Sequence, residues 1–166
     1  RVKTMTVDEK IAHWKKVFQH AEDRGIDIFL FHWDVYVNSA EGHYGITPDQ
    51  TNEKTVAYVR ACVKETLLTY PQIKGIGVTS GEDDRRELDG TADSTENYIF
   101  KTYGRGIMDA QADSRWKDRP FRFIFRRHGT EYEWARDAMA QYTGGVINTS
   151  TKYSVAHMYS SRRPTE

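Results

Sequence analysis

Residues 73–84 read Ile73-Lys-Gly-Ile-Gly-Val-Thr-Ser-Gly-Glu-Asp-Asp84, a short apolar run followed at once by small and acidic residues. The apolar part has the length of a strand, and its two glycines permit a neighbouring backbone to approach closely. The carboxylates come directly after it, so they would emerge where the strand ends. This stretch predicts a buried strand of a parallel sheet with polar side chains at its carboxyl end.

The segments before this strand predict two helices and another strand. Thr6 and Glu9 form a capping-box pattern that begins the first helix. The run from Ile26 to Val37 is nearly continuously apolar until His32, which predicts a strand covered on both faces. Residues 52–69 predict a second helix that Pro71 stops. Helical spacing predicts a buried stripe on the first helix that contains Ile11, Trp14, Val17, Phe18 and Ala21.

The same alternation continues towards the end of the chain. Helices around 95–112 and 131–142 precede strands at 121–127 and 145–149, the last of which is weaker. Alternating helices and buried strands predict right-handed crossovers and a parallel α/β sheet of βα units. Two architectures fit: an open doubly wound sheet, or part of a (β/α)₈ barrel.

The partial barrel is favoured because no glycine-rich phosphate turn follows the first strand. A complete barrel typically needs about 250 residues, whereas this chain has 166 residues, enough for about half of one. We therefore expect residues 1–166 to form one α/β domain, a half barrel. Because a half barrel leaves two sheet edges unpaired, we expect it to be a fragment of a larger barrel or to pair with another copy.

The amino-acid composition indicates which kinds of binding partner are expected. Lys plus Arg (24) balance Asp plus Glu (24), so no basic field attracts nucleic acid. No apolar run reaches the length of a membrane span, and membrane binding is not expected. Cys62 is the single cysteine; it predicts no disulfide and no metal cluster, and it is expected to pack on a helix. The ten tyrosines and four tryptophans supply rings that can stack on sugars.

Polar residues collect at the predicted carboxyl ends of the strands, where parallel α/β folds bind ligands. Carboxylates, cations, imidazoles and an indole occur together there, which suits an anionic, hydroxyl-rich ligand. The candidate site residues are His32, Trp33, Asp34, Glu82, Asp83, Arg126, Arg127, His128 and Lys152.

Glu82 is the candidate catalytic residue. It follows a strand and a Ser-Gly pair, so its carboxyl group can be aimed at a cleft. A glycosidase needs one carboxylic acid to protonate the departing oxygen and usually a second carboxylate. Partial burial, together with Asp83 or Asp34 nearby, would raise the pKa of Glu82 for this role. In the alternative interpretation, Glu82 and Asp83 cap a turn or face solvent.

The remaining candidates are substrate ligands. By strand alternation, His32 and Asp34 share one face and Trp33 lies on the other. Arg126 and Arg127 offer forks that match a carboxylate, one pointing into the barrel and the other towards the helices. Structural alternatives are hydrogen bonds to neighbouring loops for the first group, and ion pairs with barrel carboxylates for the arginines. A metal- or phosphate-dependent site that uses His32, Asp34 and His128 is a further alternative, although no tight ligand spacing supports it.

Several runs together resemble the (β/α)₈ barrels of family 67 α-glucuronidases and related bacterial polysaccharide-degrading glycoside hydrolases. These runs are Phe31-His-Trp-Asp-Val-Tyr-Val37, Tyr70-Pro-Gln-Ile-Lys-Gly-Ile-Gly-Val-Thr-Ser-Gly-Glu82, Phe100-Lys-Thr-Tyr-Gly-Arg-Gly106, Phe121-Arg-Phe-Ile-Phe-Arg-Arg-His128 and Lys152-Tyr-Ser-Val-Ala-His-Met-Tyr-Ser160. The resemblance spans most of the chain from about Ile26.

The resemblance implies hydrolysis of a plant or algal polysaccharide, including one that bears uronic acid, without a cofactor and in a secreted or periplasmic location. The four strands would be the third to sixth of the barrel, with Glu82 as the acid after the fourth. Arg126, Arg127 and Lys152 would lie near an acidic sugar. The chain departs from this pattern because no carboxylate stands at the end of its last predicted strand, where a second catalytic group is expected. A non-catalytic carbohydrate-binding or structural module is the alternative function.

Overall fold

The computed structural model describes residues 4–32, 37, 40–79, 95–127, 130 and 132–151. Helices and strands alternate along the chain as the sequence predicts. In order, the elements are α1 (Val7–Glu22), β1 (Ile28–His32), α2 (Glu53–Thr69), β2 (Ile73–Thr79), α3 (Thr95–Ile99), a π-helical turn η1 (Phe100–Gly104), α4 (Arg105–Gln111), β3 (Arg122–Arg126), α5 (Tyr132–Ala138), a 3-10 turn η2 (Met139–Gln141) and β4 (Val146–Ser150).

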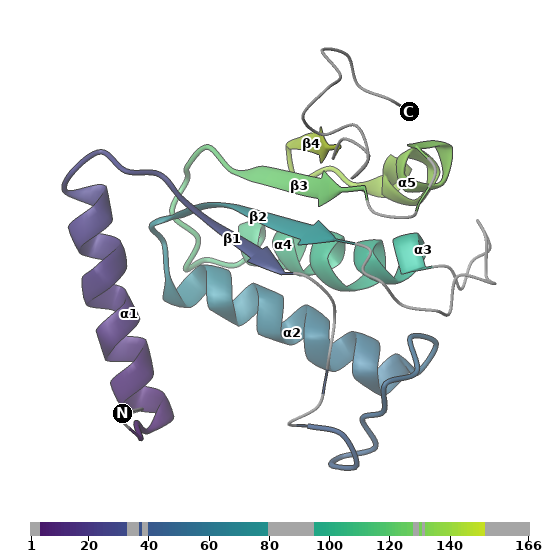
Figure 1. Cartoon of the computed structure of the whole chain (residues 1–166), viewed down its shortest axis with the longest axis horizontal. Coiled ribbons are helices and arrows are strands. Elements are labelled where there is room, and N and C mark those ends of the chain that lie inside the picture. Colours follow the sequence, from purple (N-terminus) through teal and green to yellow (C-terminus); the bar gives the residue numbers. More distant parts are fainter. Residues whose placement is uncertain are drawn as a thin grey trace, which may run out of the picture.

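The four strands form one parallel sheet in the order β1-β2-β3-β4, which confirms the predicted α/β fold with alternating βα units. Each strand pairs with the next one along the chain, so every connection advances in the same direction. Right-handed crossovers that all advance the same way place their helices on the same face of the sheet. Figure 1 shows α2 and α4 together below and behind the strands.

The predicted bounds of the first two helices are confirmed. The Thr6 hydroxyl accepts from the Glu9 N–H at 3.2 Å, and the Glu9 carboxylate accepts from the Thr6 N–H at 2.8 Å, completing the capping box. Asn52 caps α2 by accepting from the Lys54 N–H at 2.9 Å. Gly25, after α1, has a φ of 68°, a conformation that glycine adopts without strain.

The core lies between the sheet and its helices. From the sheet, Ile76, Val78, Phe123 and Phe125 point into it and are almost completely buried. They pack against apolar residues of α2, α3 and α4, including Val63, Leu67, Ile99 and Ile107. Helices α2 and α4 pack closely because Gly106 has no side chain. A Cβ atom at that position would lie 2.8 Å from the backbone oxygen of Arg60.

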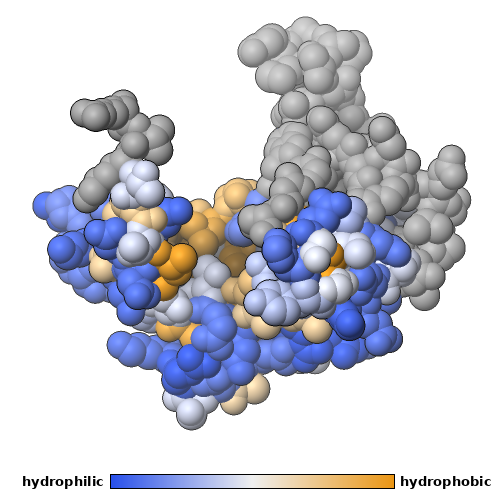
Figure 2. Space-filling model, turned by 90° about the horizontal axis from the view of Figure 1, so that it is seen from below, coloured by the Kyte–Doolittle hydropathy of each residue, from blue (hydrophilic) through white to orange (hydrophobic). Residues whose placement is uncertain are grey.

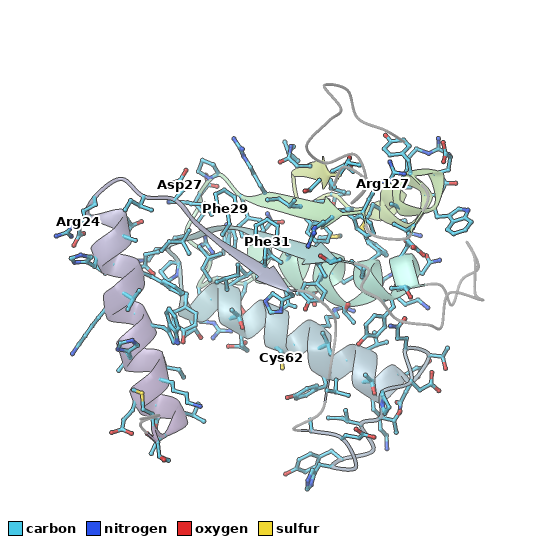
Figure 3. The ribbon with its side chains drawn as sticks, in the orientation of Figure 1. Arg24, Asp27, Phe29, Phe31, Cys62 and Arg127 are labelled. Atoms are coloured by element: carbon cyan, nitrogen blue, oxygen red, sulfur yellow. The ribbon has the colours of Figure 1, made fainter. Side chains whose placement is uncertain are left out.

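The opposite face of the sheet has no cover from any described helix. Phe31 of β1 is 58% exposed there, so the prediction that β1 is covered on both faces is wrong. Figure 3 shows Phe29 and Phe31 on β1. Their rings extend over β2, where Gly75 and Gly77 leave room for them. A nearly continuous apolar run predicts a strand of a parallel sheet. It does not show which parts of the protein pack against each face of that strand.

Helix α1 and Cys62 also depart from the predictions. Only Phe18 of the predicted α1 stripe is buried, whereas Trp14 is 47% exposed, because α1 packs beside the sheet rather than across it. Figure 2 shows hydrophobic residues gathered in the hollow beside α1. Cys62 is exposed on α2, as Figure 3 shows, so the prediction that it packs in the interior is wrong. Helical periodicity shows which face of a helix is the more apolar one. It does not determine how much of that face packs against the rest of the protein.

Candidate functional site

The carboxyl ends of three strands meet at one edge of the sheet. Thr79, the last residue of β2, pairs with Arg126, the last residue of β3, and Arg126 pairs in turn with Ser150, the last residue of β4. The segments that follow these three strands therefore leave the sheet from neighbouring points. We call this edge, with the residues that directly follow each strand, the carboxyl edge.

The structure describes three of the nine sequence-predicted site residues: His32, Arg126 and Arg127. The others, Trp33, Asp34, Glu82, Asp83, His128 and Lys152, lie outside the described residues.

His32 ends β1 and its ring faces the helical layer. The ring lies against that of Tyr103 in η1, edge to face, with 5.5 Å between the ring centroids. Partial burial lowers the pKa of the imidazole, because the charged form loses hydration. The sequence pattern did not reveal this contact with Tyr103, and a role for His32 in substrate binding stays a prediction.

Arg126 and Arg127 stand at the carboxyl end of β3. Arg126 follows the buried Phe125, so by strand alternation its side chain belongs to the face opposite the core. The Arg127 N–H donates to the Ser150 oxygen at 2.9 Å, which continues the pairing of β3 with β4. The Arg127 guanidinium donates through Nε to the backbone oxygen of Thr130 at 3.4 Å. Figure 3 shows Arg127 beyond the end of β3.

Sequence reasoning missed a buried carboxylate behind this edge. Glu96, in the first turn of α3, is 6% exposed, and it is the one charged residue among the buried side chains of the described ranges. The hydroxyl of Thr130, also buried, donates a short hydrogen bond to Glu96 Oε1. The sequence carries no local signal of this pair, because 34 residues separate its members.

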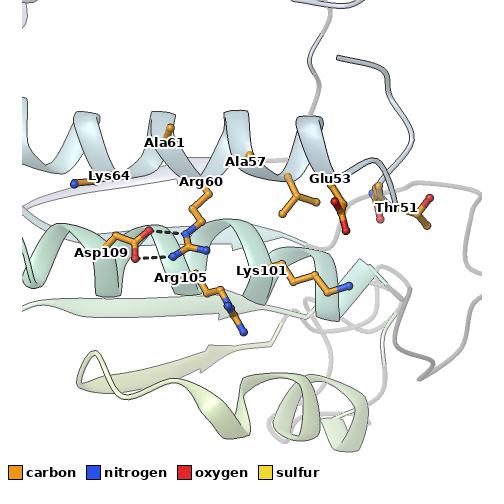
Figure 4. Close-up of a pocket in the computed structure, with 11 residues that line it drawn as sticks. Thr51, Glu53, Ala57, Arg60, Ala61, Lys64, Lys101, Arg105 and Asp109 are labelled. Atoms are coloured by element: carbon orange, nitrogen blue, oxygen red, sulfur yellow. Dashed lines mark hydrogen bonds and ion pairs between the residues drawn. The ribbon is translucent and has the colours of Figure 1, made fainter. Parts of the chain in front are cut away.

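A second concave region lies on the outer, helical side of the molecule. It is a groove of about 700 Å³ between α2 and the η1–α4 segment (Figure 4). Its lining is Gln50, Thr51, Glu53, Val56, Ala57, Arg60, Ala61, Lys64, Lys101, Arg105 and Asp109.

Ion pairs account for much of the charge in this groove. Arg60 binds Asp109 through Nε at 2.5 Å and Nη2 at 2.7 Å, a two-pronged contact that holds the pKa of Asp109 below its usual value. Lys64 pairs with Asp113 at 2.9 Å. Two of the four cations are thereby bound by carboxylates. The carboxyl edge is the better candidate site, because ligands of parallel α/β folds gather there and because it adjoins the buried carboxylate.

No group of three or more His, Cys, Asp or Glu side chains within the described ranges is arranged to hold a metal ion. Among the helices in those same ranges, none combines the length and the apolar character needed to cross a membrane.

Comparisons of the chain with protein-family models, with curated proteins and with solved structures gave no significant match. The resemblance to glycoside hydrolases therefore stays a prediction.

Proposed function

We propose that this chain forms half of a (β/α)₈ barrel and acts as a glycoside hydrolase on a plant or algal polysaccharide that bears uronic acid. Glu82 would be the general acid. Arg126 or Arg127 would anchor the sugar carboxylate, and the other candidates, from His32 to Lys152, would bind hydroxyl groups and neighbouring sugar units.

The strand order supports the barrel part of the proposal. A doubly wound sheet reverses its strand order at a switch point, whereas the four described strands follow one another without reversal. Among the described residues, α2 and α4 lie on one face of the sheet, and on the opposite face phenylalanine rings lie over glycines. A barrel wall has this arrangement, because helices surround the barrel and layers of side chains fill its interior.

The register at the carboxyl edge is the observation that carries the catalytic part. Thr79 and Arg126 are partners in the sheet, and Glu82 is the third residue after Thr79 in the sequence. An acid that follows β2 and a cation that ends β3 therefore belong to adjacent strand ends. The two groups would have separate roles on an acidic sugar: the guanidinium can bind the sugar carboxylate, and the carboxylic acid can protonate the glycosidic oxygen.

The test is release of product from paired neutral and uronic-acid oligosaccharides. We expect Glu82→Gln to lower turnover more than about a hundredfold, since general acid catalysis contributes at least that much. Glu87→Gln, in the same polar segment, is the matched control and should retain turnover. Turnover that survives in Glu82→Gln would remove Glu82 from the mechanism.

The arginines have their own test. Arg126→Gln or Arg127→Gln should raise KM about tenfold or more for the uronic-acid substrate and leave the neutral one unchanged, because only the acidic sugar offers a carboxylate. Arg122→Gln, at the other end of β3, is the control. Binding without turnover by the unaltered protein would support the non-catalytic carbohydrate-binding alternative instead.

A further inference from the structure

Hydrogen bonds link the segments that follow β1, β2 and β3 with one another and with the end of β4. The Thr95 hydroxyl, at the start of α3, donates to Gln50 Oε1 at 3.2 Å, which joins the segment after β2 to the one after β1. The next residue, Glu96, accepts from the hydroxyl of Thr130, in the segment after β3. The Arg127 N–H donates to the backbone oxygen of Ser150, the last residue of β4. We call this chain of contacts the edge belt.

The link between Glu96 and Thr130 is the most buried member of the edge belt. Both side chains are less than a tenth exposed, whereas the contact between Thr95 and Gln50 is only partly buried. Water competes poorly for a buried hydrogen bond, and a buried polar group left without its partner is costly. Breaking this link should therefore loosen the segments after β2 and β3 relative to each other more than breaking any exposed link.

We propose that Glu96 is a positioning residue, which uses its hydrogen bond with Thr130 to hold the segments after β2 and β3 in one arrangement. This inference rests on the proposed function, because the segment after β2 carries the candidate acid Glu82 and the segment after β3 adjoins the candidate anchors Arg126 and Arg127. Glu96 itself acts behind the carboxyl edge and does not contact substrate. A small displacement of a catalytic group can cost a large factor in rate, so the position of these segments matters for turnover.

The first experiment measures amide hydrogen exchange and does not depend on activity. Thr130→Val removes the donor with little change of shape, and Thr130→Ser keeps it. We expect exchange in residues 95–99 and 127–130 to accelerate about tenfold or more in Thr130→Val, while the amides of Phe123 and Val78 keep their protection. Thr130→Ser should behave like the unaltered protein. Equal exchange in the valine variant and the unaltered protein, or acceleration in all of these amides alike, would overturn the proposal.

A double variant tests whether Glu96 and Thr130 act through one shared hydrogen bond or independently of each other. Glu96→Gln keeps an acceptor without a full charge, so it should accelerate exchange in the same residues by a smaller factor. If the two side chains act through one bond, Glu96→Gln combined with Thr130→Val should be no faster in exchange than Thr130→Val alone. Factors that multiply would show independent roles and contradict the proposal. Glu133→Gln, exposed on α5, is the matched control.

Measurements of kcat test whether the edge belt affects turnover. On the uronic-acid substrate, assayed well below the melting temperature of each variant, Thr130→Val should lower kcat about tenfold or more, and Thr130→Ser should restore it. A kcat that stays unchanged despite faster local exchange would show that the pair holds the segments without positioning the acid. If the unaltered protein releases no product, the proposed function fails, while the exchange results still decide whether Glu96 and Thr130 hold these segments together.

Discussion

The two faces of the sheet are built from the same strands and have opposite surroundings. On the helical face, Phe123 and Phe125 are buried almost completely beneath α2 and α4. On the other face, Phe31 and Val146, which is 61% exposed, lie on the surface formed by the described residues. Parallel sheets are normally covered on both faces. Burial beneath the described helices therefore accounts for Phe123 and Phe125 but not for Phe31 and Val146.

The open face differs from the helical face in composition as well as in cover. Charged residues are interspersed with apolar ones along β3, where Arg122, Ile124 and Arg126 share this face by alternation. On β2 the same face consists of small residues, with Gly75 and Gly77 beneath the rings of β1. A mixture of rings, glycines and arginines is in keeping with the interior of a barrel that binds a polar ligand at one end.

The largest expected effect compares one phenylalanine from each face. Phe123→Ala should lower the free energy of unfolding by about 3–5 kcal/mol, because it leaves a cavity in a packed core. Phe31→Ala should cost less than about 1 kcal/mol, because more than half of the side chain is already exposed. Urea denaturation measures both values.

The opposite outcome for Phe31→Ala would be equally informative. A loss as large as that of Phe123→Ala would mean that the open face is covered in solution. Sedimentation at several protein concentrations would then distinguish a second copy, whose effect depends on concentration, from cover within one molecule.

An intermediate effect is expected from the two glycines of β2. A Cβ atom on Gly75 would lie 2.6 Å from the backbone oxygen of Arg122, which cannot move without disturbing β3. The three atoms nearest to a Cβ atom on Gly77 all belong to the ring of Phe31, which can swing into the open face. Gly75→Ala should therefore cost about 2 kcal/mol or more, and Gly77→Ala less than about 1 kcal/mol.

Thermal unfolding of the two variants side by side measures this difference. Equal melting temperatures for Gly75→Ala and Gly77→Ala would show that the ring of Phe31 is as immobile as the backbone of β3, and hence that the open face is packed.

The smallest effect concerns pH. Because the pKa of His32 is lower in the folded protein than in the unfolded chain, the unfolded chain binds more protons between the two values. The contribution of His32 to stability should be fully present above its ordinary pKa and should be lost as the pH falls through that window. His32→Phe should flatten this part of the stability profile. An NMR titration of the ring that gave a pKa at or above the ordinary value would contradict the burial against Tyr103.

Much of the fold was predictable because its signals are local. The capping box of Thr6 and Glu9 and the apolar runs of β2 and β3 each lie within one element, and the structure confirms them. The candidate site was less predictable. Arg126 and Arg127 could be placed at a strand end, whereas the partners of His32 and Glu96 come from other segments.

By itself, the sequence determined which segments become helices and strands and that the strands run parallel, because these follow from periodicity and the alternation of elements. Only the tertiary structure decided which face of the sheet is covered, that His32 lies against Tyr103, and that Glu96 meets Thr130. Those contacts join residues that are distant along the chain. Such residues meet only once strand register and crossover direction are set, and no local pattern encodes both.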